Sequence, residues 1–102
     1  MREDGGASLK VVVRLASVLR VHAGGAAFLE LEVPAPVTVR TVVDAMAAAH
    51  PAVGRRVRDE AGTLRRHVNV FVGADNARDL DDVDTVVPEG AEVAVLPAVS
   101  GG

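Results

Sequence analysis

The sequence predicts an α+β domain in which one main helix packs across a mixed sheet of four to five strands. Three observations predict this class: short segments that alternate between apolar and polar residues, one longer segment with apolar residues three and four positions apart, and proline or glycine between the segments. A chain of 102 residues has room for one core. We expect the domain at residues 9–97, between a disordered leader at 1–8 and a flexible tail at 98–102.

The first two strands are predicted at residues 9–16 and 27–33. Apolar residues at every second position put one face of each strand in the core: Leu9, Val11, Val13 and Leu15, then Leu29, Leu31 and Val33. The segment between the strands ends in a turn signal at residues 22–25 (HAGG). The pair therefore predicts a hairpin with a long connection.

The main helix is predicted at residues 39–49, with Thr38 placed to cap its first turn through the side-chain hydroxyl. Its apolar stripe would face the sheet and consists of Val39, Val42, Val43, Met46 and Ala49. Arg40, Asp44 and Ala47 would then point outward. The helix should end at His50, because the residue before Pro51 is disfavoured in the α conformation.

Two more strands are predicted in the second half of the chain, at residues 67–73 and 92–96. Their inward residues are Val68, Val70 and Val72, then Val93 and Val95, which leaves Asn69, Phe71, Ala94 and Leu96 outward. Residues 52–66 predict a short helical turn followed by an exposed, arginine-rich loop, and residues 79–84 predict an acidic loop.

This order of elements is typical of the β-grasp, or ubiquitin-like, architecture. A small ferredoxin-like sandwich is the closest competing fold. It would need a second long helix between the later strands, and residues 79–84 are too short and too acidic to form one.

Composition excludes several functions. The chain has no cysteine, which excludes disulfides, thiolate zinc sites, cysteine-bound iron–sulfur clusters and cysteine nucleophiles. A formal net charge of −3 argues against a main role in binding nucleic acid. No apolar run approaches the roughly 20 residues that span a bilayer. We therefore expect a cytoplasmic protein that is a monomer when free and has no nucleic-acid or membrane partner.

No active site, metal site or permanently bound cofactor is expected within the predicted domain. His22, His50 and His67 are scattered over a turn, a helix end and a strand start, whereas a metal needs converging ligands. The acidic residues at 79–84 lack the spacing of a calcium loop. The arginines at 55–66 lack interleaved aromatic residues, so a solvated or protein-docking surface is favoured over a nucleic-acid patch.

The last two residues, Gly101 and Gly102, are the informative feature. The five residues beyond Pro97 can reach about 17 Å when extended, far enough to enter a partner's buried site. Glycine lets the walls of such a site close on bare backbone, because it has no Cβ. A terminal carboxylate is a poor electrophile at neutral pH, but adenylation by ATP followed by attack of a sulfur donor would leave a thiocarboxylate. Catalysis would then belong to the partner.

With this tail, residues 66–72 (RHVNVFV) and residues 96–102 (LPAVSGG), the chain resembles the ubiquitin-like sulfur carriers of the ThiS/MoaD class, most of all the carriers for cysteine synthesis. The resemblance implies that a MoeB/ThiF-like enzyme uses ATP to adenylate Gly102, that a thiocarboxylate forms there, and that the carrier docks on a sulfur-accepting synthase. It implies two sets of site residues: a tail of Gly101, Ser100, Val99 and Ala98, and a partner-binding face of Phe71, Leu96 and Pro97.

The resemblance leaves the sulfur acceptor open among molybdopterin, thiamin, cysteine, thiolated tRNA and thio-containing natural products. A second hypothesis is a non-catalytic β-grasp module that binds protein or RNA. In that case loss of the tail changes nothing, whereas neutralising Arg55, Arg56, Arg65 and Arg66 weakens binding.

Overall fold

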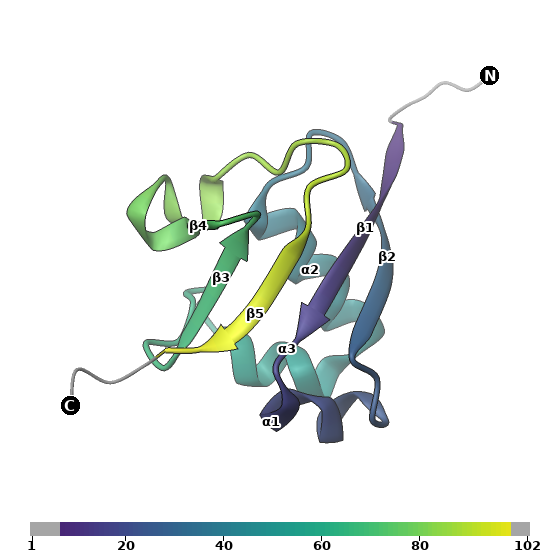
Figure 1. The fold of residues 1–102 in the computed structure, drawn as a ribbon, viewed down its shortest axis with the longest axis vertical. Helices are drawn as coiled ribbons and strands as arrows, with labels where there is room; N and C mark the ends of the chain where they lie inside the picture. Colours follow the sequence, from purple (N-terminus) through teal and green to yellow (C-terminus); the bar gives the residue numbers. More distant parts are fainter. Residues whose placement is uncertain (1–6, 99–102) are drawn as a thin grey trace.

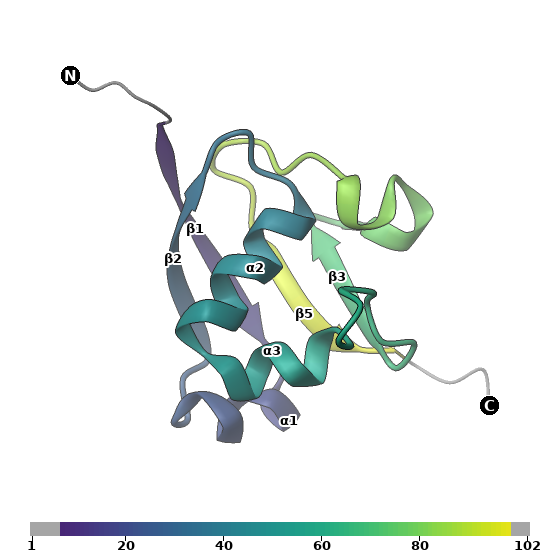
Figure 2. The same ribbon diagram turned by 180° about the vertical axis from the view of Figure 1, so that it is seen from behind.

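A five-stranded mixed sheet with its main helix on one face forms the fold, which a computed structural model describes for residues 7–98. The strand order is β2-β1-β5-β3-β4, with these bounds: β1 Ser8–Leu15, β2 Phe28–Pro34, β3 Val68–Val72, β4 Asp75–Asn76 and β5 Val93–Pro97. The main helix, α2 (Val39–Ala49), lies across one face, and the shorter α3 (Pro51–Val57) follows it (Figure 1 and Figure 2). The predicted β-grasp architecture is confirmed.

The strand pairing places β5 at the centre of the sheet. β5 runs parallel to β1, with Val93 opposite Val13, and antiparallel to β3, with Val95 opposite Val70. The side chains that alternate toward α2 form the sheet's half of the core: Val11, Val13, Leu15, Leu29, Leu31, Val33, Val68, Val70, Val72, Val93 and Val95. The inward residues predicted from alternation are therefore buried, with Leu9 partly buried at the margin.

Thr38 caps α2, as predicted. The Thr41 N–H donates to Thr38 Oγ1 at 3.3 Å, and the Thr38 N–H donates to Thr41 Oγ1 at 2.9 Å. This reciprocal pair satisfies two backbone donors that the helix itself leaves without partners. The helix ends at His50, before Pro51, also as predicted.

Two alanines of α2 differ from the prediction. Ala49 was expected in the apolar stripe and is exposed, whereas Ala47 was expected to point outward and is half-buried. The cause is α3, which begins at Pro51 and packs Gly54 against Ala47. Proline is compatible with the first turn of a helix because the N–H it lacks would have no partner there. Pro51 therefore ends one helix and starts the next.

The connection between β1 and β2 is long and ends in a turn at Gly24 and Gly25, as predicted, but the part before the turn is helical, which the sequence did not predict. It contains α1 (Ser17–Arg20) and the 3-10 helix η1 (Val21–Ala23), which ends at Gly24 with a φ of 65°. Arg20 Nε donates to the Leu15 carbonyl at 3.0 Å, tying α1 to the end of β1. β1 begins at Ser8, one residue earlier than expected, and residues 1–6 of the expected leader lie outside the described residues.

Ala94 was expected on the exposed side of β5, but only 3% of its surface is exposed. The strand register explains the difference. Ala94 lies opposite Arg14 on one side and Phe71 on the other, and both side chains are much larger than a methyl group. On a sheet face without a helix, a small residue between two large ones is buried by its neighbours.

The acidic segment packs against the start of α2. It forms two 3-10 helices, η2 (Ala77–Asp79) and η3 (Asp82–Asp84). Asp84 forms an ion pair with Arg40 at 3.0 Å, and the carbonyl of buried Thr85 accepts from the Val39 N–H at 3.0 Å. Among residues 7–98, no helix is long and apolar enough to cross a membrane.

Candidate functional site

The root of the tail is fixed to the centre of the sheet. Pro97, at the end of β5, pairs with Val68, and the Ala98 N–H donates to the His67 carbonyl at 2.8 Å. The chain thus leaves the sheet beside the start of β3 (Figure 1). The predicted tail residues Val99, Ser100, Gly101 and Gly102 lie outside the described residues.

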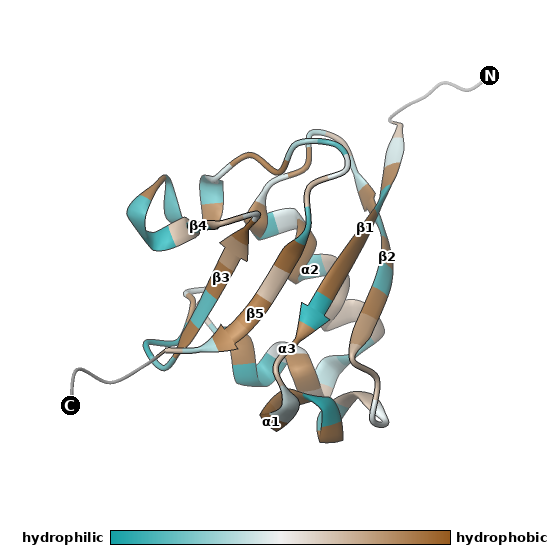
Figure 3. Ribbon diagram, in the orientation of Figure 1, coloured by the Kyte–Doolittle hydropathy of each residue, from teal (hydrophilic) through white to brown (hydrophobic). Residues whose placement is uncertain are grey.

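The sheet face opposite α2 carries two of the three predicted partner-binding residues. Phe71 lies on β3 opposite Ala94, and Leu96 lies two residues further along β5, so the two side chains are diagonal neighbours. Both are half-buried. Figure 3 views the sheet from this side and shows that β3 and β5 consist largely of apolar residues, those facing α2 included. We call Phe71, Ala94 and Leu96 the outer apolar strip.

Pro97 lies on the other side of the sheet from the outer apolar strip. Successive side chains of a strand point to opposite faces, so Pro97 follows Leu96 on the side of the helices. There Pro97 lines a pocket together with residues of α1 and α3. The structure therefore divides the predicted partner-binding residues between two surfaces on either side of the tail's root.

Polar contacts fix the edges of the outer apolar strip. Arg78 Nε donates to Asn69 Oδ1 at 3.1 Å, and its guanidinium also donates to the carbonyls of Val68 at 2.8 Å and Arg65 at 2.5 Å. β4 pairs only with Phe71 and the residue after it, so Arg78 occupies the open edge of the first half of β3. This blocks a strand edge that would otherwise pair with another chain.

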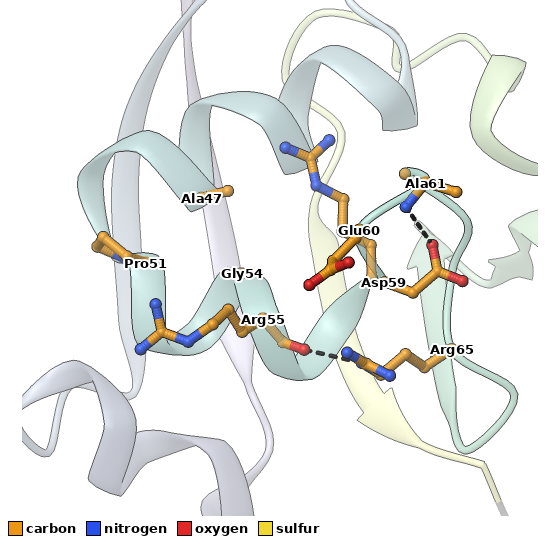
Figure 4. A pocket seen from close by; sticks show the side chains of 10 residues that line it. Ala47, Pro51, Gly54, Arg55, Asp59, Glu60, Ala61 and Arg65 are labelled. Atoms are coloured by element: carbon orange, nitrogen blue, oxygen red, sulfur yellow. Dashed lines mark hydrogen bonds between the residues drawn. The ribbon is translucent and has the colours of Figure 1, made fainter.

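The arginine-rich segment lines a pocket with a volume of about 490 Å³ (Figure 4). Several of its charged side chains are bonded within the protein: Arg65 Nε donates to the Arg55 carbonyl at 2.8 Å, and Asp59 Oδ1 accepts from the N–H groups of Ala61 and Thr63 at 2.9 and 3.0 Å. Arg58 pairs with Asp44 of α2. The mixture of positive and negative side chains, three of which bond to groups of the protein itself, favours a structural role for this pocket over binding of a nucleic acid.

A smaller pocket, about 240 Å³, lies at the root of the tail. Its lining comes from four parts of the chain: Val18, Leu19 and His22; Arg56; His67 and Val68; and Pro97. We call it the tail-root pocket. Sequence reasoning missed it because α1 was not predicted. The one available signal was apolar spacing, since Val18 and Val21 are three residues apart, as on one face of a helix.

Two of the three histidines that look scattered in the sequence meet at this pocket. His22 and His67 both line it, whereas His50 lies at the end of α2. Among residues 7–98, no group of three or more His, Asp or Glu side chains is placed to hold a metal ion. The described residues thus present two partly apolar surfaces on either side of the anchored end of β5.

Comparison with known proteins gives one family and several relatives. Residues 13–102 match the model of the ThiS family. The chain is 29% identical over 96 residues to the sulfur carrier protein CysO of Mycobacterium tuberculosis, covering 92% of this chain and all of that protein. It is 33% identical over 78 residues to small archaeal modifier protein 1 of Haloferax volcanii, which covers 76% of this chain and 85% of that protein. A chain of the Amycolatopsis orientalis BexX/CysO complex is similar in structure, with a TM-score of 0.76 and 30% identity. The match covers 90% of this chain and 99% of that chain.

Proposed function

Because the chain belongs to the ThiS family, we propose that it is a sulfur carrier whose Gly102 carboxylate is adenylated and then converted to a thiocarboxylate. The expected resemblance to sulfur carriers, with CysO among them, is confirmed. In this function the chain is the substrate, and a MoeB/ThiF-like enzyme supplies the catalysis and binds the ATP. The need for ATP is consistent with a cytoplasmic carrier.

The chemistry requires a chain end that can enter an active site while the domain stays outside it. A carboxylate oxygen of Gly102 attacks the α-phosphorus of ATP, and pyrophosphate leaves. A hydrosulfide then attacks the carbonyl carbon of the acyl adenylate and displaces AMP, which leaves the thiocarboxylate. The carrier finally docks on a synthase that accepts the sulfur.

One observation carries this proposal: the tail is attached to the central strand of the sheet, next to apolar side chains that are partly exposed. β5 is bonded on both sides, and the hydrogen bond from Ala98 to His67 holds the last described residue beside the start of β3. Phe71 and Leu96 on one side, and Pro97 on the other, would contact the partner when Gly102 enters its site. The BexX/CysO complex supports this view, since a similar chain occurs there in a complex with another protein.

Intact-protein mass spectrometry tests the proposal. The chain ending at Gly102 is incubated with ATP, a sulfide source and a MoeB-like enzyme from a GC-rich bacterium. We expect a gain of about 16 Da, as sulfur replaces oxygen. The matched controls lack Gly102 or carry one added residue after it, and neither should gain mass, although both should keep the thermal unfolding midpoint of the parent chain.

No gain with several such enzymes, in a sample shown to end at Gly102, would contradict the carrier proposal and favour the alternative of a β-grasp module that binds protein or RNA. That module would keep its binding after loss of the tail. Neutralising Arg55, Arg56, Arg65 and Arg66 would weaken that binding, whereas deletion of Gly102 would leave it unchanged.

The similarity to small archaeal modifier protein 1 favours one second candidate, in which the activated Gly102 is transferred to an amine of another protein. A lysine amine would replace hydrosulfide as the nucleophile that displaces AMP. Tryptic digests of cell extract would then contain lysines that carry the C-terminal peptide of this chain. The Gly102-deleted chain is the control, and absence of such peptides would restrict the function to sulfur transfer.

A further inference from the structure

We propose that the tail-root pocket is a second docking site for the enzymes that act on Gly102, and that it receives an aliphatic side chain of the partner next to a carboxylate. The inference rests on the proposed function and adds a surface to it. The pocket lies on the helix side of the sheet, on the opposite side from the outer apolar strip.

The short reach of the tail brings the partner to this pocket. Ala98 is held to His67 by its N–H, and four residues follow it. Four extended residues span about 14 Å at most. An active site that surrounds the last two glycines uses up half of that length. The rim of the partner must therefore lie against the surface around Pro97, which is the tail-root pocket on one side and the outer apolar strip on the other.

One exposed aliphatic residue lines the pocket, and a second lies next to the pocket residue His22 in the sequence. Val18 at its rim is 61% exposed and Val21, on the following 3-10 helix, is 73% exposed, while Leu19 and Val68 form a buried apolar floor. Exposed valine side chains lose contact with water when a partner covers them, and a pocket of about 240 Å³ has room for one aliphatic side chain. The tail-root pocket thus favours an apolar group at its centre.

The polar side chains of the pocket indicate which polar group of the partner would lie beside its aliphatic side chain. Arg56, His22 and His67 line it, and no side-chain hydrogen bond or ion pair within residues 7–98 involves any of the three. Arg58 and Arg78, in contrast, are bonded within the protein. An arginine side chain is a donor only, and a carboxylate accepts from it in a two-pronged geometry. The partner group that fits beside the aliphatic side chain is therefore an aspartate or glutamate.

The test measures thiocarboxylate formation by the MoeB-like enzyme as a function of carrier concentration, by the gain of about 16 Da. One test variant is V18S/V21S, which removes the exposed aliphatic surface, and the other is R56E, which reverses the charge. Val86→Ser is the matched control, because Val86 is also exposed, at 66%, but lies beside the start of α2. Thermal unfolding midpoints establish that all variants are folded.

We expect each test variant to raise the KM for the carrier about tenfold while kcat at saturation changes little, as for loss of one important contact. Val86→Ser should leave both constants unchanged. Added salt should raise the KM of the parent chain more than that of R56E, because the lost interaction is between charges.

Three outcomes would overturn the inference. An unchanged KM in both test variants, with a parent chain that gains 16 Da, would reject the pocket and leave the carrier function intact. A parent chain that gains no mass would reject both. Third, NMR shifts of His22 and Arg56 that change on deletion of residues 99–102, or on dilution, would identify the chain's own tail or a second copy as the occupant in place of an enzyme.

Discussion

Gly54 of α3 packs directly against Ala47 of α2: a Cβ placed on Gly54 would lie 2.5 Å from the Ala47 Cβ and 2.7 Å from its Cα. Both residues lie in helices, and no left-handed backbone conformation is involved. The glycine is required for space. It allows α3 to approach α2 and to bury Val53 and Val57 in the core.

Gly54→Ala should therefore lower the free energy of unfolding, by about 1–3 kcal/mol, as for other cases of overpacking. Glycine to alanine within a helix would otherwise be stabilising. Urea denaturation monitored by circular dichroism measures the change. The double variant A47G/G54A should recover part of the loss. A Gly54→Ala variant more stable than the parent would show that α2 and α3 can move apart at little cost in free energy.

Phe71→Ala should leave the fold intact and weaken docking of the activating enzyme. The ring is half-buried on the face without a helix, so its removal costs less than the roughly 3–5 kcal/mol typical of a fully buried phenylalanine. The KM for the carrier should rise while the thermal midpoint falls only slightly. Phe28→Ala is the control, since Phe28 is 55% exposed on the distant strand β2. A large loss of stability in the Phe71 variant alone would assign the ring to the core.

Val70→Asp should unfold the domain, because Val70 is fully buried and faces α2 on a strand next to the central one. A carboxylate there would have to be buried without a partner. Far-ultraviolet circular dichroism at 25 °C should show loss of structure. Asn69→Asp is the neighbouring control, on the opposite face and within reach of Arg78, and should remain folded. A folded Val70 variant would contradict the core described above.

Arg78→Ala should expose the open edge of β3. The guanidinium makes three hydrogen bonds there, and their loss should cost about 1–3 kcal/mol at a partly solvated site. We also expect concentration-dependent association, which analytical ultracentrifugation detects. Arg66→Ala, another exposed arginine outside these contacts, should remain monomeric. If the two variants associate to the same extent, Arg78 does not protect this strand edge.

Elements whose apolar residues repeat at the spacing of a strand or a helix were predictable from the sequence. Elements that depend on contacts with distant parts of the chain were not. The alternation around Val13 and Val70, and the capping residue Thr38, each follow from local chemistry. α1 has only four residues, too few to show a helical period, and it is held in place by the bond from Arg20 to Leu15. For α3 the sequence suggested only a helical turn, because Gly54 disfavours a helix and seven residues are too few to show a helical period.

The candidate site was predictable only in part, for a similar reason. The sequence alone suggested a reactive chain end and placed Phe71 and Leu96 on the face without a helix. It did not suggest the tail-root pocket, because His22, Arg56 and His67 are brought together by the packing of α1 and α3 against the ends of β3 and β5. The alternation of side chains along β5 was a signal that Pro97 and Leu96 lie on opposite faces of the sheet.

The central position of β5 also has a mechanical consequence. A partner that pulls on the chain beyond Ala98 pulls along β5, whose hydrogen bonds to β1 and β3 lie across the direction of the force. These bonds share the load and must fail together, whereas the bonds of a peeled edge strand fail one after another. An enzyme can therefore draw the chain end into its active site, or release it under strain, without unravelling the domain to which it is attached.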